Sequence, residues 1–388
     1  MSGPVQQSAP AAQRPAAEPR KRIASLDVVR GLMLCVSVSV NSLLLTPAWF
    51  DHAEWTGVNG LDLVFPVFVV LTGCGLGFAM HRRTDVRSLA RRVLVLVAVG
   101  LLYNAVVTAT WEWSTWRFTG VLQLYAGVVV VVALGHLLTR TARGWFLVTV
   151  LLAAAHTAVL AAYGTTCPGG ELTRGCNPSG AVDPAVYGAA HTYWEGAAGH
   201  DPEGVVAILG ACVSAAAGAC IGHLLLAVRA RGGGPRRAAR PVLAAAAAFT
   251  ALAWLTATVP GLVAGVDVPA MKRLWTAPFA LTVTAAVAVA LLAGHLLLDS
   301  ARTPAALRRA VWPLEALGRN SLLVYFGSHV VMALLVHDVD AEGRTLAQRI
   351  AGAVAVGGNE QVGFTVLVLV AWTVLAAVLH HRRIYLRP

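Results

Sequence analysis

The chain is 388 residues long, with 57% hydrophobic residues, only 13% charged residues and a formal net charge of +11. A soluble domain carries about 25% charged residues, so this composition excludes an ordinary soluble protein. Positive charge in a soluble protein suggests nucleic-acid binding, whereas in a membrane protein it reflects the basic residues of cytoplasmic segments.

The N-terminal residues 1–22 are rich in Ala, Pro, Gln and Ser and contain no apolar core. We expect a disordered cytoplasmic tail here rather than a cleaved signal peptide. Residues 23–388 are then expected to form one transmembrane domain.

Ten apolar runs follow, several of them about 20 residues long, which is the length that crosses ~30 Å of hydrocarbon. They lack the alternation of apolar and polar residues that a β-barrel requires. The prediction is an all-α, polytopic membrane protein with about ten transmembrane helices. The predicted spans are 26–47, 61–80, 91–110, 119–138, 145–163, 203–228, 241–260, 275–298, 314–336 and 361–380.

The distribution of basic residues predicts the orientation of these spans. With the N-terminus in the cytoplasm, 24 of the 30 Lys and Arg residues fall in cytoplasmic segments. Both termini are then cytoplasmic, and the segment between the first two spans lies on the outer face. The Gly-containing basic segment 229–240 is expected to be a flexible cytoplasmic linker. The excess of Arg and Ala suggests a GC-rich genome and a bacterial inner membrane.

The segment between the first two spans points most strongly to chemistry. It contains His52, flanked by Asp51, Glu54 and Trp55, and Asp62 opens the next span. Ionisable side chains at the mouth of a bilayer are functional candidates. An imidazole near a carboxylate can accept and return a proton near neutral pH. The alternative interpretation is an ordinary loop histidine.

Polar residues in the first span have two interpretations each. Asn41, near its outer end, can bond another helix or donate a hydrogen bond to a developing oxyanion. Asp27 and Arg30 are three residues apart and share one helix face. They form either an interfacial ion pair or part of a ligand entrance.

The long outer loop, residues 164–202, contains Cys167 and Cys176. Two cysteines in one loop of an oxidising compartment predict a disulfide, with two free thiols as the alternative. A metal site is not expected, because no second Cys or His pair with ligand spacing lies nearby.

Polar residues near the predicted outer rim and in the ninth span are further candidates. Lys272 and Trp275, together with Trp55, are candidates to bind sugar hydroxyls or anions, although aromatic residues at that depth are also ordinary interface anchors. Asn320 and Ser321 either cap a helix or hold a phosphate at a helix N-terminus. His329 lies deeper in that span, where it could instead be a core imidazole with its hydrogen bonds satisfied.

Taken together and in order, these residues resemble the heparan-α-glucosaminide N-acetyltransferase family of transmembrane acyltransferases, over about residues 22–386. The eleven-residue step from Asn41 to His52 is typical of the family. We expect a bacterial-type member without the lumenal domain of animal members. The elements that carry the resemblance are Ser25–Gly31, Asn41, His52–Gly57, Asp62–Val69, Arg117–Gln123, the two Cys elements of the outer loop, Asp201–Gly204, Leu274–Trp275 and Asn320–Tyr325.

The resemblance implies that acetyl-CoA is the donor, bound from the cytoplasm with its pantetheine arm between helices, and that no metal is needed. An amino sugar or glycan on the outer face would be the acceptor. His52, with Asn41 and Asp62, would be catalytic, with His52 acting as a general base or carrying the acetyl group covalently. The residues expected to bind acetyl-CoA are Arg30, Arg82, Arg83, Arg319, Asn320, Ser321 and Tyr325, and those expected to bind the acceptor are Glu54, Trp55, Arg117, Lys272 and Trp275.

Two departures from the family pattern leave the acceptor sugar open. Leu124 stands where the family often has Arg. Ser328 stands where it often has His. His329 comes one position later, about 100° around a helix, so we expect it to face elsewhere.

Two other functions remain open from the sequence. One is a secondary transporter of a glycan, lipid precursor or drug, although the chain shows no broken-helix pattern repeated in matching halves. The other is a non-catalytic partner of envelope enzymes. The expected partners are the acceptor and the lipid bilayer, with no nucleic acid and with a homodimer left open.

Overall fold

The computed structural model describes residues 23–45 and 50–386, so the predicted N-terminal tail lies outside the described residues. The all-α prediction is confirmed. Within the described ranges, nine helices are long and apolar enough to cross a membrane. They are α1 (Ala24–Asn41), α2 (Val64–Met80, preceded by the 3₁₀ turn η2, Gly60–Leu63), α3 (Val86–Thr108), α4 (Val121–Leu138), α5 (Ala142–Gly164), α7 (Val205–Ala230), α8 (Pro235–Ala264), α9 (Ala277–Leu298) and α14 (Glu360–His381).

The predicted ninth span is broken into α11 (Trp312–Arg319) and α12 (Ser321–His337), which are bent by 78°. The side-chain amide of Asn320 lies at the break and donates to the carbonyls of Ala316 at 3.1 Å and Ala376 at 3.5 Å. Backbone carbonyls freed inside an apolar bundle need such partners. With this pair counted as one span, the described residues contain up to ten.

The connections contain short helices that the apolar pattern does not predict. The segment predicted as a flexible linker, 229–240, is helical at both ends, because α7 continues to Ala230 and α8 already begins at Pro235. Proline is well suited to a first helical position. The short elements are α6 (Pro178–Tyr187), α10 (Ala305–Ala310), α13 (Leu346–Ala353) and the 3₁₀ turns η3 (Pro168–Gly170), η4 (Ala189–His191) and η5 (Tyr193–Gly196).

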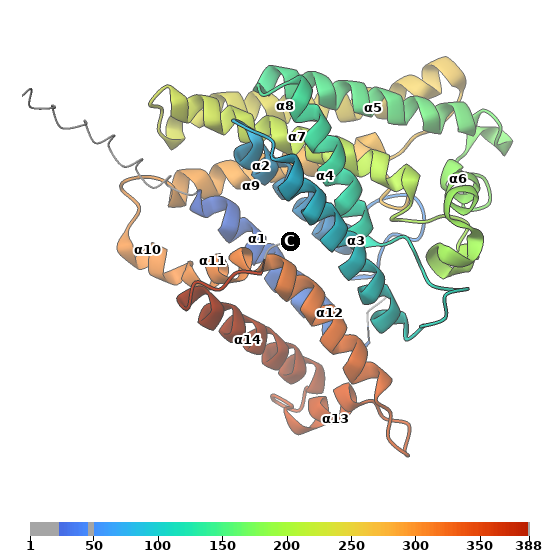
Figure 1. Ribbon diagram of the computed structural model, residues 1–388, viewed down its shortest axis with the longest axis vertical. Coiled ribbons are helices and arrows are strands. Elements are labelled where there is room, and N and C mark those ends of the chain that lie inside the picture. The colour runs from blue at the N-terminus through green and yellow to red at the C-terminus, as the bar shows by residue number, and fades with distance from the viewer. Residues whose placement is uncertain (1–22, 46–49, 387–388) are drawn as a thin grey trace, which may run out of the picture.

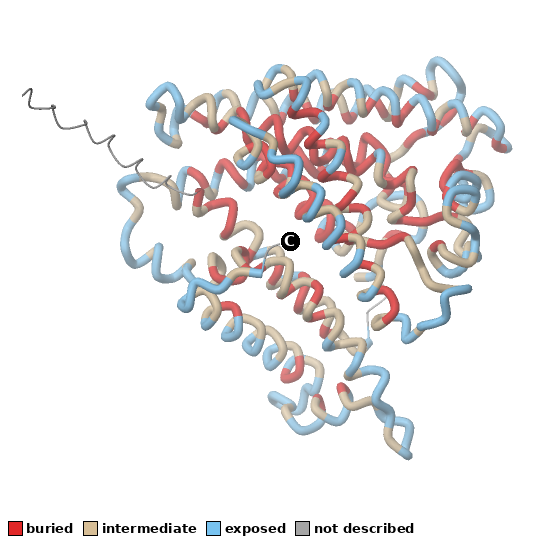
Figure 2. The backbone as a smooth tube through the Cα atoms, in the orientation of Figure 1, coloured by how far each residue is buried: buried red, intermediate tan, exposed pale blue. Residues whose placement is uncertain are grey.

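Helices α2 and α7 are the most buried of the long helices and lie at the centre of the bundle (Figure 2). They pack through small residues. A Cβ atom added at Gly73 would overlap the Ala215 carbonyl oxygen, and one added at Gly218 would overlap that of Val70. Close backbone contact of this kind is how helices associate where burial from water gives no driving force.

Glycines also fix the broken helix against α1. A Cβ atom at Gly31 would overlap the Leu314 carbonyl oxygen, and one at Gly318 would overlap that of Asp27. The close approach places Arg319, the last residue of α11, beside Asp27 of α1, with Nε 3.5 Å from Oδ2.

The bundle has two distinct ends (Figure 1). Helix α10 lies at one end, and α6 with its flanking loops lies at the other. The loop before α6 contains a disulfide between Cys167 and Cys176, with an S–S distance of 2.04 Å. The loop that carries His52 follows α1, whose first residues lie at the α10 end.

Candidate active site

His52 lies between α1 and α2 and contacts a buried carboxylate. Its ring Nδ1 lies 2.6 Å from Oδ1 of Asp62, whose side chain is 1% exposed. Oδ2 of Asp62 accepts hydrogen bonds from the backbone N–H groups of Ala53 at 3.0 Å and Asn59 at 2.9 Å. These bonds fix the carboxylate, which in turn orients the imidazole with Nδ1 as the donor. Nε2 is then the ring nitrogen able to accept a proton.

The His52 loop is joined to the loop between α8 and α9. A backbone bridge connects Gly57 to Met271. The next residue, Lys272, places Nζ 3.3 Å from Nδ1 and 3.5 Å from Nε2 of His52, and 3.9 Å from Oδ1 of Asp62. Burial lowers the pKa of Lys272, and nearby carboxylates oppose that shift. The site therefore combines an imidazole, a carboxylate and a partly desolvated cation.

His52 and Lys272 face a cavity of about 410 Å³, here named the His52 cavity. Its wall combines residues from α1, α2, α12 and the loops before α7 and α9. The polar side chains in this wall belong to Ser37, Asn41, His52, Glu203, Lys272, Tyr325 and His329.

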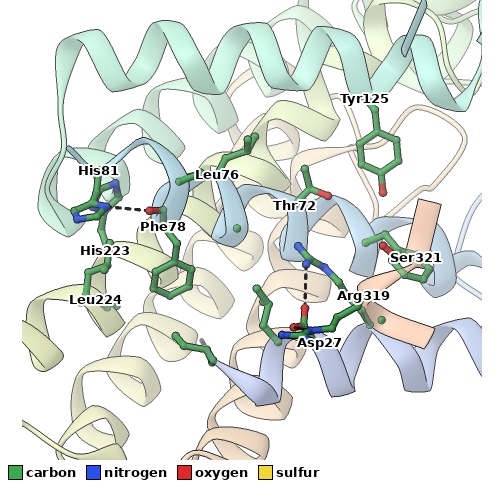
Figure 3. Close-up of a pocket in the computed structure, with 18 of the residues that line it drawn as sticks. Asp27, Thr72, Leu76, Phe78, His81, Tyr125, His223, Leu224, Arg319 and Ser321 are labelled. Carbon is green, nitrogen blue, oxygen red and sulfur yellow. Dashed lines mark hydrogen bonds and ion pairs between the residues drawn. The ribbon is translucent and has the colours of Figure 1, made fainter. Parts of the chain in front are cut away.

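A second and larger cavity, of about 1870 Å³, is here named the arginine cavity. Figure 3 shows Asp27, Arg319 and Ser321 on one side of it and His81 and His223 on another. Among the described residues, Asp27 is the one carboxylate in its wall. The cavity is therefore a strongly positive space. The arginines that line it are Arg30, Arg82, Arg92, Arg140, Arg143, Arg229, Arg231 and Arg319.

Contacts within the protein hold several of these arginines in place. Asp27 Oδ1 lies 3.8 Å from Nη1 of Arg30, and its Oδ2 lies 3.5 Å from Nε of Arg319. Arg30 also donates through Nη2 to the Leu71 carbonyl at 2.9 Å. Oε1 of Glu315 also lies 3.4 Å from Nε of Arg319. The guanidinium groups are thus oriented without being neutralised, since the arginines in the wall far outnumber the carboxylates that contact them.

Two aromatic residues, Phe65 of α2 and Tyr325 of α12, line both cavities. The Phe65 ring contacts Tyr125 at 5.6 Å and Trp275 at 5.2 Å between ring centroids. The Tyr325 ring contacts His329 at 4.7 Å. The arginine cavity and the His52 cavity therefore adjoin at a wall built from these two residues.

Arg117 belongs to a buried ionic cluster next to the His52 cavity. Its Nη2 lies 3.1 Å from Oδ1 of Asp201 and 2.7 Å from Oε2 of Glu203. Thr119 donates to Oδ2 of Asp201 at 2.5 Å. Burial disfavours the charge, but the two carboxylates outweigh that effect and raise the pKa of Arg117. Arg117 therefore acts on the cavity through Glu203, which lies in its wall.

The two cavity walls bring together most of the residues that the sequence singled out. Asn41, His52 and Lys272 line the His52 cavity, and Tyr325 lines both. Asp62 lies directly behind His52. The predicted donor-binding residues in the wall of the arginine cavity are Arg30, Arg82, Arg319, Ser321 and Tyr325.

Other predicted residues lie elsewhere. Trp275 does not form part of a rim, because it is 1% exposed and donates to Ser214 Oγ at 3.1 Å behind Phe65. Asn320 is buried at the helix break, where its amide bonds carbonyl groups. Arg83 is exposed and lies outside both walls, and the Glu54 side chain is 93% exposed. Trp55 donates to the Leu172 carbonyl at 2.6 Å.

Sequence reasoning missed several wall residues. Glu203 was part of the Asp201–Gly204 element, but no role was predicted for it. His329 faces the His52 cavity, whereas Ser328 is 3% exposed and donates to the Tyr325 carbonyl. Basic residues beyond those predicted also line the arginine cavity, and the signal that could have found them is their position at the Arg-rich ends of the predicted spans. They are Arg92, Arg140, Arg143, Arg229 and Arg231.

The fold and these two adjoining cavities define a polytopic helical membrane protein with an imidazole–carboxylate site at one end and a cationic cavity at the other. Residues 22–168, which contain Asn41, His52 and Asp62, match the family model described as heparan-alpha-glucosaminide N-acetyltransferase, catalytic. Over these residues the match confirms the resemblance predicted from the motifs.

Two curated relatives carry the same name. The heparan-alpha-glucosaminide N-acetyltransferase of Homo sapiens is 26% identical over 85% of this chain and 55% of its own length. That of Mus musculus is 24% identical over 80% of this chain and 54% of its own length. The chain therefore spans about half the length of the curated relatives it matches.

Proposed function

We propose that the protein is a membrane acyltransferase that moves an acetyl group from acetyl-CoA to an amino group of a sugar or glycan. The observation that carries this proposal is the pair Phe65 and Tyr325, which line both cavities. A long ligand with its charged end among the arginines can therefore direct its other end toward His52 without leaving the protein.

The arginine cavity suits the nucleotide end of such a donor. Coenzyme A carries several phosphate charges, and Arg binds phosphate through paired, charge-assisted hydrogen bonds. The eight arginines against one carboxylate, Asp27, supply the complementary charge. The volume of about 1870 Å³ exceeds the roughly 300–1,000 Å³ of pockets for drug-sized ligands, which fits a large and extended donor.

The His52 site suits the transfer itself. Bound acetyl-CoA supplies a thioester that is already activated, so the protein must deprotonate the acceptor amine and stabilise the oxyanion. With Nδ1 held by Asp62, Nε2 of His52 is the proposed general base, a role worth about 10²–10⁴-fold in rate. Asp62 would fix the ring and stabilise the imidazolium that forms.

Two wall residues are proposed to stabilise the oxyanion. Asn41 lines the cavity with His52, and its side-chain amide can donate a hydrogen bond. Losing one such donor typically costs about 10²–10³-fold in turnover. Lys272, partly desolvated beside the His52 ring, adds positive charge to the same space.

We further propose that the arginine cavity opens to the cytoplasm and the His52 cavity to the opposite side. Basic residues are retained on the cytoplasmic side of membrane proteins. The disulfide between Cys167 and Cys176 lies at the α6 end, and disulfides persist in oxidising compartments. Both arguments support the same orientation.

Acetyl transfer to glucosamine by the purified protein tests the proposal. We expect His52→Ala to lower turnover by about 10²–10⁴-fold while the affinity for coenzyme A stays unchanged. His337→Ala, at an exposed histidine near the end of α12, is the matched control and should retain turnover. Wild-type turnover in the His52→Ala protein would refute the proposed role.

Incubation with acetyl-CoA in the absence of acceptor distinguishes a covalent acetyl-enzyme route from direct transfer. If His52 carries the acetyl group, mixing the protein with acetyl-CoA without acceptor yields a protein heavier by one acetyl group, and His52→Ala abolishes that mass change. Under direct transfer, the protein mass stays constant until an amine is added.

The break between α11 and α12 favours a second candidate, a secondary transporter, because discontinuous helices form the binding sites of many transporters. Counterflow of a labelled amino sugar in vesicles without consumption of acetyl-CoA would support this function over acyl transfer.

A further inference from the structure

A row of aromatic rings leads from the His52 loop to an exposed tryptophan. Trp55 contacts the His200 ring at 5.1 Å, and His200 contacts Tyr193 at 6.0 Å between ring centroids. Tyr193 stacks on Trp194 at 5.1 Å with an interplanar angle of 19°. We name these four residues the aromatic track. It connects the loop that contains the candidate base with a ring that is 70% exposed, that of Trp194.

The exposed end of the track has an unusual backbone. Trp194 has φ 49° and ψ 40°, and Glu195 has φ 51° and ψ 35°. Two successive non-glycine residues in the left-handed region cost free energy, and such conformations persist where the surroundings impose them. Strained residues of this kind cluster at binding sites, so a large exposed ring held in this way calls for a ligand.

Tyr193, the residue before Trp194, is held by groups that also contact the wall of the His52 cavity. The Arg117 guanidinium lies 4.7 Å from the centroid of the Tyr193 ring, and the Tyr193 N–H donates to Oδ2 of Asp201 at 2.9 Å. The same guanidinium donates at 2.7 Å to Glu203, which lines the His52 cavity. Arg117 thus links the track rigidly to the site of the proposed chemistry.

The chemistry of the track fits a sugar ring. One face of a pyranose presents C–H groups, which pack against the negative face of an aromatic ring. The hydroxyl groups at the edge of the sugar need polar partners, and Glu195 lies exposed beside Trp194. A flat ring with an adjacent carboxylate offers both kinds of contact.

We propose that Trp194, backed by Tyr193, binds a second sugar ring of the acceptor outside the His52 cavity, remote from the ring whose amine is acetylated. This inference rests on the proposed function and adds to it an acceptor-binding residue outside the His52 cavity. The competing role for Trp194 is that of an anchor in the membrane interface, where tryptophan is enriched.

Binding of glucosamine oligomers to the purified protein tests the inference without requiring catalysis. The probes are glucosamine and its tetramers with α-1,4 and β-1,4 linkages, titrated into His52→Ala protein. We expect at least one tetramer to bind about tenfold more tightly than the monomer, and Trp194→Asn to remove that preference. Asn tolerates the left-handed backbone, so this variant removes the ring without adding strain.

Two further variants separate stacking from an effect on folding. Trp194→Tyr keeps an aromatic face and should keep most of the preference for the tetramer. Trp111→Ala removes another tryptophan, which is 59% exposed and lies outside the track. This variant should change neither the affinity for glucosamine nor the affinity for the tetramer. Tetramers that bind no more tightly than the monomer, or a preference that survives in Trp194→Asn, would overturn the inference.

Acetyl transfer gives a second readout once turnover is established. Trp194→Asn should raise KM for the preferred tetramer about tenfold and leave kcat and the KM for glucosamine unchanged. If Trp194 is instead an anchor in the membrane interface, its replacement should change the KM values of glucosamine and of the tetramers by the same factor. Failure of acetyl transfer to any amine would count against the proposed function, whereas the binding experiment would still decide on the second ring.

Discussion

His52 owes its orientation to two separate parts of the chain. Asp62, ten residues later, fixes Nδ1, and two backbone N–H groups fix Asp62. Lys272 reaches the same ring from a loop 220 residues away. The pairing of the imidazole with the carboxylate could be predicted, because the two residues are close in sequence. The short distance between His52 and Lys272 was not, because it depends on the bridge from Gly57 to Met271.

Replacing Asp62 tests whether its carboxylate orients the His52 ring and stabilises the imidazolium. In Asp62→Asn the side chain keeps its size, but an amide can present its NH₂ group to the ring and favour the wrong tautomer. We expect turnover to fall by about 10²–10⁴-fold, with the affinity for coenzyme A unchanged. Steady-state kinetics and a separate titration with coenzyme A measure the two quantities.

Asp51→Asn is the matched control for this substitution. Asp51 is exposed and accepts a hydrogen bond from the His52 backbone N–H at 2.6 Å, which an asparagine oxygen can also accept. A large loss in Asp51→Asn together with full turnover in Asp62→Asn would show that the role assigned to the buried carboxylate is wrong.

At the scale of elements, the apolar pattern predicted the spans well and their packing poorly. The sequence predicts an unbroken span over 314–336, whereas the structure bends it by 78° beside Asn320. Hydropathy reports the preference of a segment for lipid, but not where a side-chain amide replaces a backbone hydrogen bond. The overlap that a Cβ atom would make at Gly31 or Gly318 likewise depends on the partner helix.

The short helix α6 contains a buried carboxylate, Asp183, whose titration should affect stability. Asp183 accepts hydrogen bonds from Ser179 Oγ and the Val205 N–H at the start of α7. Burial, with a contribution from the charge of Asp201, raises the pKa of Asp183 from 3.8 to about 6. The folded protein therefore holds this proton more tightly than the unfolded chain does.

The sign of the pH effect follows from that difference. As pH rises from about 4 to about 6, the folded state must lose a proton that it favours, so Asp183 reduces stability over this window. The stability of the wild type relative to Asp183→Asn should therefore fall by roughly 1–2 kcal/mol across it. Thermal unfolding of both proteins in detergent measures the difference, and a constant difference between pH 4 and 6 would contradict the raised pKa.

At the scale of the whole molecule, the proposed function depends on two cavities that no single motif predicts. Their walls draw on residues from α1 to α12, with Phe65 and Tyr325 common to both. The sequence predicted basic residues at one end and His52 at the other from charge and hydropathy. The continuity between the two ends is a tertiary property, because it depends on how α2 and α12 approach each other.

A larger ring at the shared wall should separate donor binding from transfer. Phe65→Trp adds bulk between the cavities without touching the arginines. We expect turnover to fall by about 10²-fold, because small misplacements of reacting groups have effects of that size, while coenzyme A affinity is retained. Phe78→Trp, in the wall of the arginine cavity alone, is the control and should leave turnover closer to the wild type.

Sealed vesicles that contain the purified protein test the central claim most directly, namely that the donor and the acceptor enter from opposite ends. Labelled acetyl-CoA is placed inside or outside, and a membrane-impermeant glucosamine oligosaccharide is always outside. When the donor is inside, we predict labelled oligosaccharide from the molecules whose arginine cavity faces the vesicle interior, and His52→Ala should abolish this product. When both substrates are outside, we predict none, whichever way the protein inserts. Equal labelling with both substrates on the same side would contradict the claim.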